Sequence, residues 1–465
     1  MYRRIRFPRR SRRRRRSPAG APPAEALNAL EGPALVVAPH SDDEVLATAG
    51  ALQRHRALGH RVYVALLTNG DGQYRRPFSN RRLAVQLGYR RQEETLHALS
   101  HLGIDEDEVA FLGYPDRGLS ALWNTHWSAD RPYKSPRTGA RSSPYTTSRT
   151  PNAPYCGVAL AADLEDVLRW SAPATVYLPH PNDLHYDHWA AHSFVMLVLE
   201  GMRRREEMSP KLRTYVVHRG RWPLPRGKYL GAPLPPPPAL AGLDTTWRAL
   251  PLSGEERERK FHAIMRHKSQ LRYMRRYLVS FARSNELFGR VPRLALGAWL
   301  DIADSADRWV PDEGEAPSAE EEPMVSYTDP RRRSLLRDIK RYNDIRALHL
   351  QHAGRGRLAI EVELFDRLRP ANHVLIHLRA FGEGVTLPAS LRLAIGGGEL
   401  SAASGELPPG AEFAAQPRTV RLELPIEELG SPDSVLVGGE LQRNGITFAK
   451  AAYRMVDLTT SANRG

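Results

Sequence analysis

The most constraining feature of the chain is a unit that occurs twice, in which an apolar run leads into a polar loop and then into a helical pattern. In the first unit, the run 34–38 precedes the loop 39–44, which reads Pro-His-Ser-Asp-Asp-Glu, and a helix is predicted over 44–58. In the second, the run 174–178 precedes the motif 185–188, which reads His-Tyr-Asp-His, before another helical pattern. Short apolar runs that end at polar or proline residues are typical of buried parallel strands. Each polar cluster is therefore predicted at the carboxyl end of a strand.

The pattern between the two units predicts the fold class. Further strands are expected over 61–68 and 109–112, with a helix over 81–102 between them. Such alternation favours an α/β fold with a doubly wound, mostly parallel, Rossmann-like sheet. Open sheets of this kind bind ligands at the carboxyl ends of their strands, where helix N-termini favour ionised carboxylates. The two polar clusters can therefore face each other across one crevice.

The residue types in the two clusters suit a divalent metal. His40 and Asp43 are three residues apart at a turn entering a helix, so both side chains can reach one point, while Asp42 is left free as a base. His188 from the second motif is the expected third ligand. Catalytic zinc usually has three protein ligands of nitrogen and oxygen type and one open position.

Two neighbours of His188 are given supporting roles. His185 is expected to face the substrate oxygen or the leaving amine, and Asp187 to orient a neighbouring histidine. The alternatives are that the acidic run at 42–44 only places favourable charge at a helix start, and that His188 and His192 lie on a solvated helix face. Because two motifs occur in order, each after an apolar run, the metal interpretation is favoured. His180 and His192 are expected to be packing residues or to support the ligands from outside, rather than to be ligands.

At these residues the chain resembles the PIG-L/LmbE-like family of zinc-dependent N-deacetylases, over roughly residues 30–300. The family signature is Ala-His-Pro-Asp-Asp-Glu followed later by His-x-Asp-His, and here Ser41 stands where the family most often has proline. The segments 91–94, 112–116 and 260–270 also resemble family motifs, as does Glu-Leu-Phe at 286–288.

The resemblance implies a role for each matching residue. It makes His40, Asp43 and His188 ligands of Zn²⁺, Asp42 the general base, and His185 the group that stabilises the oxyanion or acts as an acid. The implied reaction is removal of an N-acetyl group from an N-acetylglucosamine-type sugar or glycoconjugate.

Two further residues carry weaker expectations. The resemblance makes Arg91 and Asp116 candidate contacts of sugar hydroxyls. Alternatively, Arg91 pairs with Glu93 or Glu94 on a helix surface, and Asp116 only holds the turn after Pro115.

Two other functional classes are compatible with parts of the sequence. A metal-dependent nucleotide-sugar glycosyltransferase also uses acidic residues after a strand to hold a divalent metal on a diphosphate. It would not need His40 or His188. A non-enzymatic role in binding nucleic acid would rest on the N-terminal arginines alone.

The charge of the chain is concentrated at its beginning. Residues 1–20 contain ten arginines and no acidic residue, so the rest of the chain carries the net charge of +15 less these ten, or +5. Such a segment is expected to be a disordered tail that contacts anionic polymers without sequence preference. No apolar stretch is long enough to cross a membrane, and the single cysteine, Cys156, excludes an intramolecular disulfide. A cytoplasmic location is expected.

The composition divides the chain into four parts. They are an Arg-rich tail and linker over 1–28, a catalytic domain over 29–305, an acidic Pro-rich linker over 306–340, and a domain over 341–460. Six runs of period two in the last part predict an antiparallel β-sandwich. It has no tryptophan, since the last one is Trp309. We therefore favour a packing or oligomerisation module, with glycan binding as the second interpretation.

Two segments of the catalytic domain are expected to have special structure. The segment 119–157 lacks periodicity, which is typical of a lid or binding loop. Its aromatic residues could stack on a sugar or fix the loop to the body; they are Trp123, Trp127, Tyr133 and Tyr145. A capping box at Ser253 predicts one long helix with an apolar side that continues to Phe281.

Overall fold

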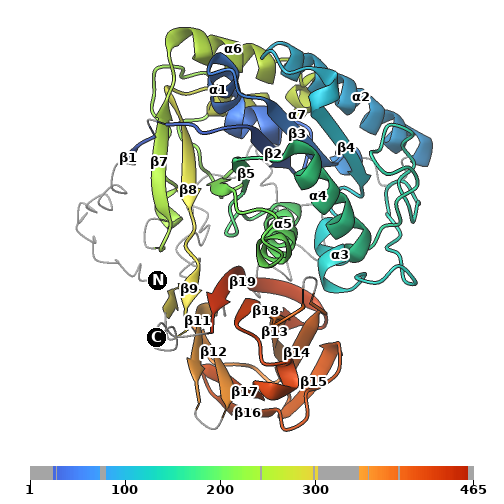
Figure 1. Cartoon of the computed structure of the whole chain (residues 1–465), viewed down its shortest axis with the longest axis vertical. Coiled ribbons are helices and arrows are strands. Elements are labelled where there is room, and N and C mark those ends of the chain that lie inside the picture. The colour runs from blue at the N-terminus through green and yellow to red at the C-terminus, as the bar shows by residue number, and fades with distance from the viewer. Residues whose placement is uncertain are drawn as a thin grey trace, which may run out of the picture.

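The computed structural model describes residues 25–27, 29–73, 80–240, 243–296, 299–301, 345–353, 356–385 and 388–458. Residues 1–24 of the predicted tail and the whole predicted linker 306–340 lie outside this part of the chain. Figure 1 shows two bodies in contact, a larger one of helices and strands and a smaller one of strands.

The larger body is built on a mixed sheet of eight strands in the order β1-β7-β8-β6-β5-β2-β3-β4. The five strands from β6 to β4 are parallel, whereas β8 is antiparallel to both β6 and β7. The chain winds one way from β2 through β3 to β4 and the other way from β5 to β6. The strands are β1 (Glu25–Ala26), β2 (Ala34–Ala38), β3 (Val62–Thr68), β4 (Val109–Tyr114), β5 (Thr175–Pro179), β6 (Lys211–Tyr215), β7 (Thr246–Pro251) and β8 (Asn285–Arg290).

Helices cover both faces of this sheet. Successive residues of a strand point to opposite faces, and in β2 Val36 belongs to one hydrophobic cluster while Leu35 and Val37 belong to another. The first cluster includes side chains of α1, α6 and α7, and the second includes those of α3, α4 and α5. The helices are α1 (Asp43–Ala57), α2 (Arg81–Ser100), α3 (Leu119–Asn124), α4 (Gly157–Ser171), α5 (Tyr186–Arg204), α6 (Gly254–Ile264) and α7 (Lys268–Leu278).

The prediction of one long helix from Ser253 to Phe281 is wrong. The structure has two helices, α6 and α7, which are separated at residues 265–267. His267 is the N-cap residue of α7, and its buried ring lies 3.4 Å from a carboxylate oxygen of Glu44. No glycine or proline lies at the break, and the apolar pattern continues through it, so the sequence gives no local signal for it.

The smaller body consists of two sheets that share one hydrophobic core. The five-stranded sheet has the order β10-β11-β12-β17-β16, and the six-stranded sheet has the order β15-β14-β13-β18-β19-β9. All pairs are antiparallel except β9 with β19. The strands are β9 (Leu294–Ala295), β10 (Trp299–Asp301), β11 (Ile345–His352), β12 (Arg357–Leu364), β13 (Asn372–Phe381), β14 (Leu391–Gly396), β15 (Glu399–Ser404), β16 (Glu412–Gln416), β17 (Thr419–Pro425), β18 (Ser434–Arg443) and β19 (Ile446–Asp457).

The chain enters the smaller body earlier than the predicted boundary at residue 305. Strands β9 and β10 precede that position and are hydrogen-bonded to the C-terminal sheets. The six predicted C-terminal strands are present, and β11, β15 and β16 are additional. A core shared by two sheets is the arrangement expected of a sandwich.

The two bodies pack through aromatic residues. Tyr453 of β19 stacks on Trp189 of α5 and meets Trp123 of α3 edge-on. The guanidinium carbon of Arg379 lies 3.6 Å from the ring centre of Trp127. Trp123 and Trp127 of the predicted lid therefore fix it to the rest of the molecule.

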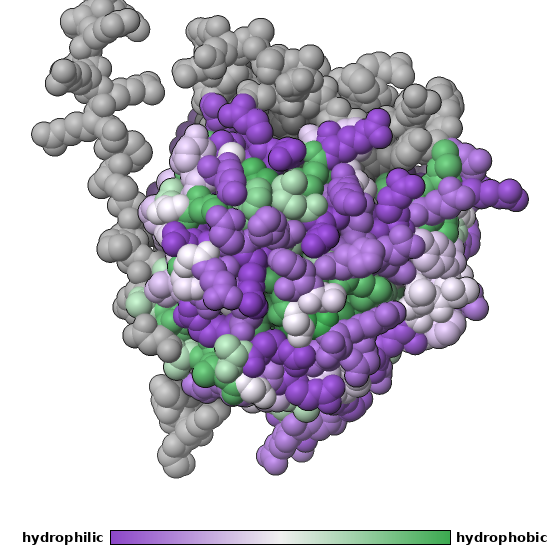
Figure 2. All heavy atoms as spheres, turned by 90° about the horizontal axis from the view of Figure 1, so that it is seen from above, coloured by the Kyte–Doolittle hydropathy of each residue, from purple (hydrophilic) through white to green (hydrophobic). Residues whose placement is uncertain are grey.

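The surface is predominantly polar on the face that Figure 2 shows, with hydrophobic residues in smaller areas between the polar ones. None of the helices within the described residues has both the length and the apolar composition needed to cross a membrane.

Candidate metal centre

The two polar clusters predicted from the sequence meet at the point where the sheet reverses its winding. Strands β2 and β5 are parallel neighbours, and the loops that follow them lead into α1 and α5 (Figure 1). This is the position at which open α/β sheets usually bind ligands. The backbone topology therefore brings His40 and His188 together, although 147 residues separate them in the chain.

Three donor atoms from these loops form a small triangle. The carboxylate oxygen Oδ2 of Asp43 lies 3.2 Å from His40 Nδ1 and 3.1 Å from His188 Nε2. The two imidazole nitrogens are 3.4 Å apart. A tetrahedral zinc ion with bonds of about 2.0–2.1 Å separates its ligand atoms by about 3.3 Å. The donors are thus spaced as they would be around one ion, and their chemistry suits zinc.

The far sides of both imidazoles contact carboxylates. His40 Nε2 lies 3.1 Å from Asp187 and 3.4 Å from Asp116, and His188 Nδ1 lies 3.2 Å from Asp183. These carboxylates lie on the side of each ring that faces away from Asp43, so the nitrogens that face Asp43 would be the ones to bind a metal ion. Histidines that bind metals in proteins usually have such partners. Asp187 was expected to orient a neighbouring histidine, and its contact with His40 is of that kind.

The backbone of Asp42 is strained. Its φ angle is 129°, a region that residues other than glycine rarely adopt. The turn is held from outside, because the carbonyl of Ser41 accepts hydrogen bonds from Arg91 Nη2 and from Gln270 Nε2. The backbone N–H of Asp42 donates to Glu44. Strain that several contacts maintain is typical of functional positions.

The side chain of Asp42 has an unusual affinity for protons. Burial raises its pKa to about 7, with Arg91 opposing the shift and Asp43 adding to it. A carboxylate with a pKa near neutrality exchanges protons readily with a substrate or water.

Arg91 is buried against the turn that carries Asp42. Arg91 is 3% exposed, and its guanidinium donates to the carbonyls of Gly70 and Ser41 and lies 3.8 Å from Asp42. These contacts contradict the alternative of a surface pair with Glu93 or Glu94, and the sugar contact stays a prediction. Asp116 is also buried; it accepts from Gly72 N and faces His40.

His185 lies beside the triangle but has a different hydrogen-bond pattern. Its Nδ1 accepts the backbone N–H of Asp187 at 3.2 Å, as an N-cap residue does at the start of α5. The hydrogen of a neutral ring is therefore on Nε2. Burial, followed by the positive charge of His40, holds the pKa of His185 well below its usual value. The half-buried ring is thus a neutral hydrogen-bond donor.

One histidine near the triangle was not predicted. His218 follows β6, and its ring centre is 4.7 Å from that of His188 and 5.0 Å from that of His185. Its position after a strand is one where functional residues are expected in an open α/β sheet. However, the run that forms β6 reads Lys-Leu-Arg-Thr-Tyr, which lacks the apolar signature of the other strands.

The remaining aromatic residues of the predicted lid are also anchored. The hydroxyl of Tyr145 donates to Asp71 at 2.7 Å, and burial raises the pKa of that carboxyl to about 7. The backbone N–H of Tyr133 donates to the carbonyl of Tyr155. His180 and His192 behave as expected of packing residues, since each is buried and bonded to a neighbouring polar group.

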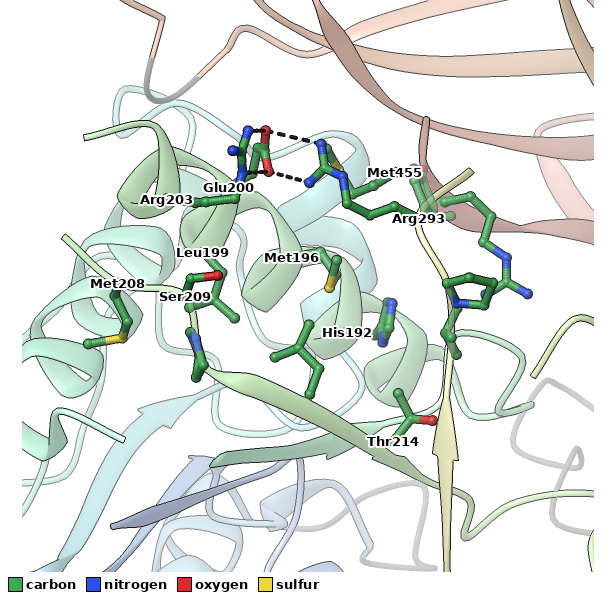
Figure 3. A pocket seen from close by; sticks show the side chains of 16 residues that line it. His192, Met196, Leu199, Glu200, Arg203, Met208, Ser209, Thr214, Arg293 and Met455 are labelled. Carbon is green, nitrogen blue, oxygen red and sulfur yellow. Dashed lines mark hydrogen bonds and ion pairs between the residues drawn. The ribbon is translucent and has the colours of Figure 1, made fainter. Parts of the chain in front are cut away.

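A separate pocket lies on the other side of α5, between this helix and the smaller body (Figure 3). Its cavity measures about 150 Å³, and ion pairs of Glu200 with Arg203 and Arg293 lie at its edge. Three methionines contribute to its lining, which are Met196, Met208 and Met455. None of the triangle residues lines it, so it is distinct from the metal centre.

The chain is similar to one protein family and to several solved structures. Residues 35–199 match the PIG-L family model, which is described as GlcNAc-PI de-N-acetylase. No curated protein matches the chain significantly.

Three of the similar solved structures illustrate the range. The conserved protein TT1542 from Thermus thermophilus is 21% identical, with 53% of this chain and 84% of that chain covered and a TM-score of 0.31. The N,N'-diacetylchitobiose deacetylase from Pyrococcus horikoshii is 17% identical, with 55% and 82% covered and a TM-score of 0.35. GalB, the 4-carboxy-2-hydroxymuconate hydratase from Pseudomonas putida, is 16% identical, with 57% and 98% covered and a TM-score of 0.35.

Proposed function

We propose, on the premise that residues 35–199 belong to the PIG-L family, that the chain is a zinc-dependent hydrolase of N-acetylated sugars. The substrate class is an N-acetylglucosamine-type sugar or glycoconjugate. The observation that carries this proposal is the triangle of His40, Asp43 and His188, whose donor atoms are 3.1–3.4 Å apart. Two nitrogens and one oxygen form a donor set that suits catalytic zinc.

A zinc ion held by these residues would polarise the acyl carbonyl and make a water molecule more acidic. Asp42 would take the proton of the attacking water, because its pKa of about 7 suits transfer near neutral pH. The amide C–N bond then breaks, acetate leaves, and the amine of the sugar receives the proton. Arg91 and Gln270 act as positioning residues, since both hold the turn that carries Asp42.

His185 would stabilise the negative charge that develops on the acyl oxygen. Its Nε2–H is available because Nδ1 already accepts a backbone hydrogen bond. A fixed donor of this kind stabilises a transition state because it does not need to reorient during the reaction. Asp187 keeps His40 oriented, and Asp116 supports the same imidazole.

The glycosyltransferase alternative has less support. A metal that binds a diphosphate is held mainly by oxygen ligands, whereas two of the three donors here are imidazole nitrogens. We further propose that the larger body, which ends with β8, forms the catalytic module and that the smaller body, which begins with β9, forms a β-sandwich that packs against it.

Acetate release from a panel of N-acetylated sugars and glycoconjugates tests the proposal. The zinc-loaded protein should release acetate from at least one of them. The variant Asp42→Asn should retain zinc and lose about 10²–10⁴-fold in kcat, the usual contribution of a general base. Asp163→Asn is a matched control, because Asp163 is also a buried carboxylate but accepts from Tyr114 and Thr150. Acetate release by Asp42→Asn at the parent rate would refute the assignment of the base.

A further inference from the structure

His218 also lies beside the triangle of His40, Asp43 and His188. One ring nitrogen of His218 and the donor atoms of those three residues all lie within 4.8 Å of one another. His218 comes from the loop after β6, so it approaches from a third strand end. Its ring is half-buried, as is that of His185.

The hydrogen-bond pattern of His218 is that of a metal ligand. The hydroxyl of Tyr277 donates to the carbonyl of Val217, so its oxygen can accept the hydrogen on His218 Nδ1 at 3.3 Å. A neutral imidazole carries only one ring hydrogen, so Nε2 is left with a free lone pair. His188 has the same pattern, with Nδ1 facing Asp183 and Nε2 facing Asp43.

His185 provides the contrast. It is equally close to the triangle, yet its Nδ1 accepts a hydrogen bond and its Nε2 carries the hydrogen. The partner of Nδ1 therefore leaves a lone pair on Nε2 of His218 but a hydrogen on Nε2 of His185. In a histidine, the hydrogen bond of one ring nitrogen decides whether the other nitrogen donates a hydrogen or binds a metal.

The position of His218 is fixed by the residue that also fixes His188. Asp183 Oδ2 accepts the backbone N–H groups of Val217 and His218, both at 2.9 Å, and contacts His188 Nδ1. One buried carboxylate thus ties the two histidines together.

We propose that His218 is a fourth protein ligand of the ion held by His40, Asp43 and His188. This inference rests on the proposed function for the presence of the ion. Catalytic zinc sites keep a position for water or substrate and can expand to five-coordinate in the transition state. His218 would therefore increase the affinity for zinc, while water or substrate would occupy a fifth position.

Metal binding to the full-length chain tests this inference without an activity assay. Zinc affinity is measured by competition with a chelator, and Co²⁺ is used as a spectroscopic substitute for zinc. His218→Ala should weaken zinc binding by at least about 100-fold, since even loss of an outer partner costs about 10–100-fold. It should also change the ligand-field spectrum of bound Co²⁺, because water replaces a nitrogen ligand. Tyr277→Phe should weaken binding by about 10-fold and leave the spectrum similar.

The control is His60→Ala, which removes a half-buried histidine that follows α1. It should leave zinc affinity and the cobalt spectrum unchanged. If His218→Ala binds zinc within about threefold of the parent and gives the same cobalt spectrum, the inference is refuted. If the parent binds zinc with His218 as a ligand but releases no acetate from any substrate, the proposed function fails while the inference holds.

Discussion

At the scale of single residues, the site depends on the contacts that fix each side chain. Two of the three predicted ligands could be found from spacing alone, because His40 and Asp43 lie in one turn. The third required the assumption that two strand ends meet, which the topology satisfies. The contacts of Arg91 with the turn could not be predicted, because they depend on the packing of α2 against the turn, which no local pattern encodes.

The strained backbone of Asp42 leads to a prediction that separates stability from activity. At a φ of 129°, glycine has no steric penalty because it lacks a Cβ. Alanine has a Cβ and therefore has the same steric penalty as aspartate. Both Asp42→Gly and Asp42→Ala should abolish acetate release. Asp42→Gly should nevertheless be more stable than Asp42→Ala by about 1 kcal/mol, the lower end of the cost of such strain. Urea unfolding of the two variants measures the difference, and equal stabilities would show that the turn is not strained.

At the scale of elements, the helices and strands with strong apolar patterns were predicted, whereas those with weak patterns were missed. Strands β2, β3 and β5 and helices α1 and α2 were predicted to within about two residues, because their burial is continuous or strongly periodic. Strands β15 and β16 were missed since most of their residues are exposed and small or charged. The break between α6 and α7 was missed because the contact of His267 with Glu44 overrides a continuous helical pattern.

The attachment of the segment 119–157 gives a prediction for an element. Gly88 in α2 lies against Tyr145, and a Cβ at this position would collide with the Tyr145 hydroxyl. Gly88→Ala should lower the free energy of unfolding by about 1–2 kcal/mol, because the collision outweighs the higher helix propensity of alanine. It should also make the segment more susceptible to limited proteolysis. Gln86→Ala, at an exposed position of the same helix, should do neither. Unchanged protease sensitivity of Gly88→Ala would show that Tyr145 does not anchor the segment.

At the scale of the whole molecule, the two bodies share a hydrophobic cluster. The cluster that packs one face of the larger sheet includes Phe381, Leu436, Tyr453 and Met455 from the C-terminal strands. Ion pairs join the bodies around Glu200, whose carboxylate contacts Arg293 at 2.5 Å and accepts from the hydroxyl of Ser434. The C-terminal part therefore has a packing role at least, as the absence of tryptophan in its sequence suggested.

This junction should make stability depend on pH. Burial raises the pKa of Glu200, but Arg203 and Arg293 outweigh it and lower the value from 4.5 to about 2. A folded-state pKa below the unfolded one adds stability above about pH 4.5, and this contribution is lost as the pH falls through about 2. Glu200→Gln should therefore lower the free energy of unfolding by about 2 kcal/mol at pH 7, with a smaller difference at lower pH.

Urea unfolding at several pH values tests this prediction. Glu255→Gln is the control, because Glu255 pairs with Arg259 on the exposed surface of α6, where such pairs contribute little. A difference between Glu200→Gln and the parent that stays constant from pH 7 to about pH 3 would contradict the assigned pKa.

The central claim is that one divalent ion is held jointly by the loops after β2 and β5. The most direct measurement is anomalous diffraction at the zinc edge from crystals of the zinc-loaded chain. The account predicts one strong peak about 2.0–2.2 Å from His40 Nδ1, Asp43 Oδ2 and His188 Nε2, and no peak there in His188→Ala crystals. Zinc bound only elsewhere, or a peak at this position that persists in His188→Ala crystals, would contradict it.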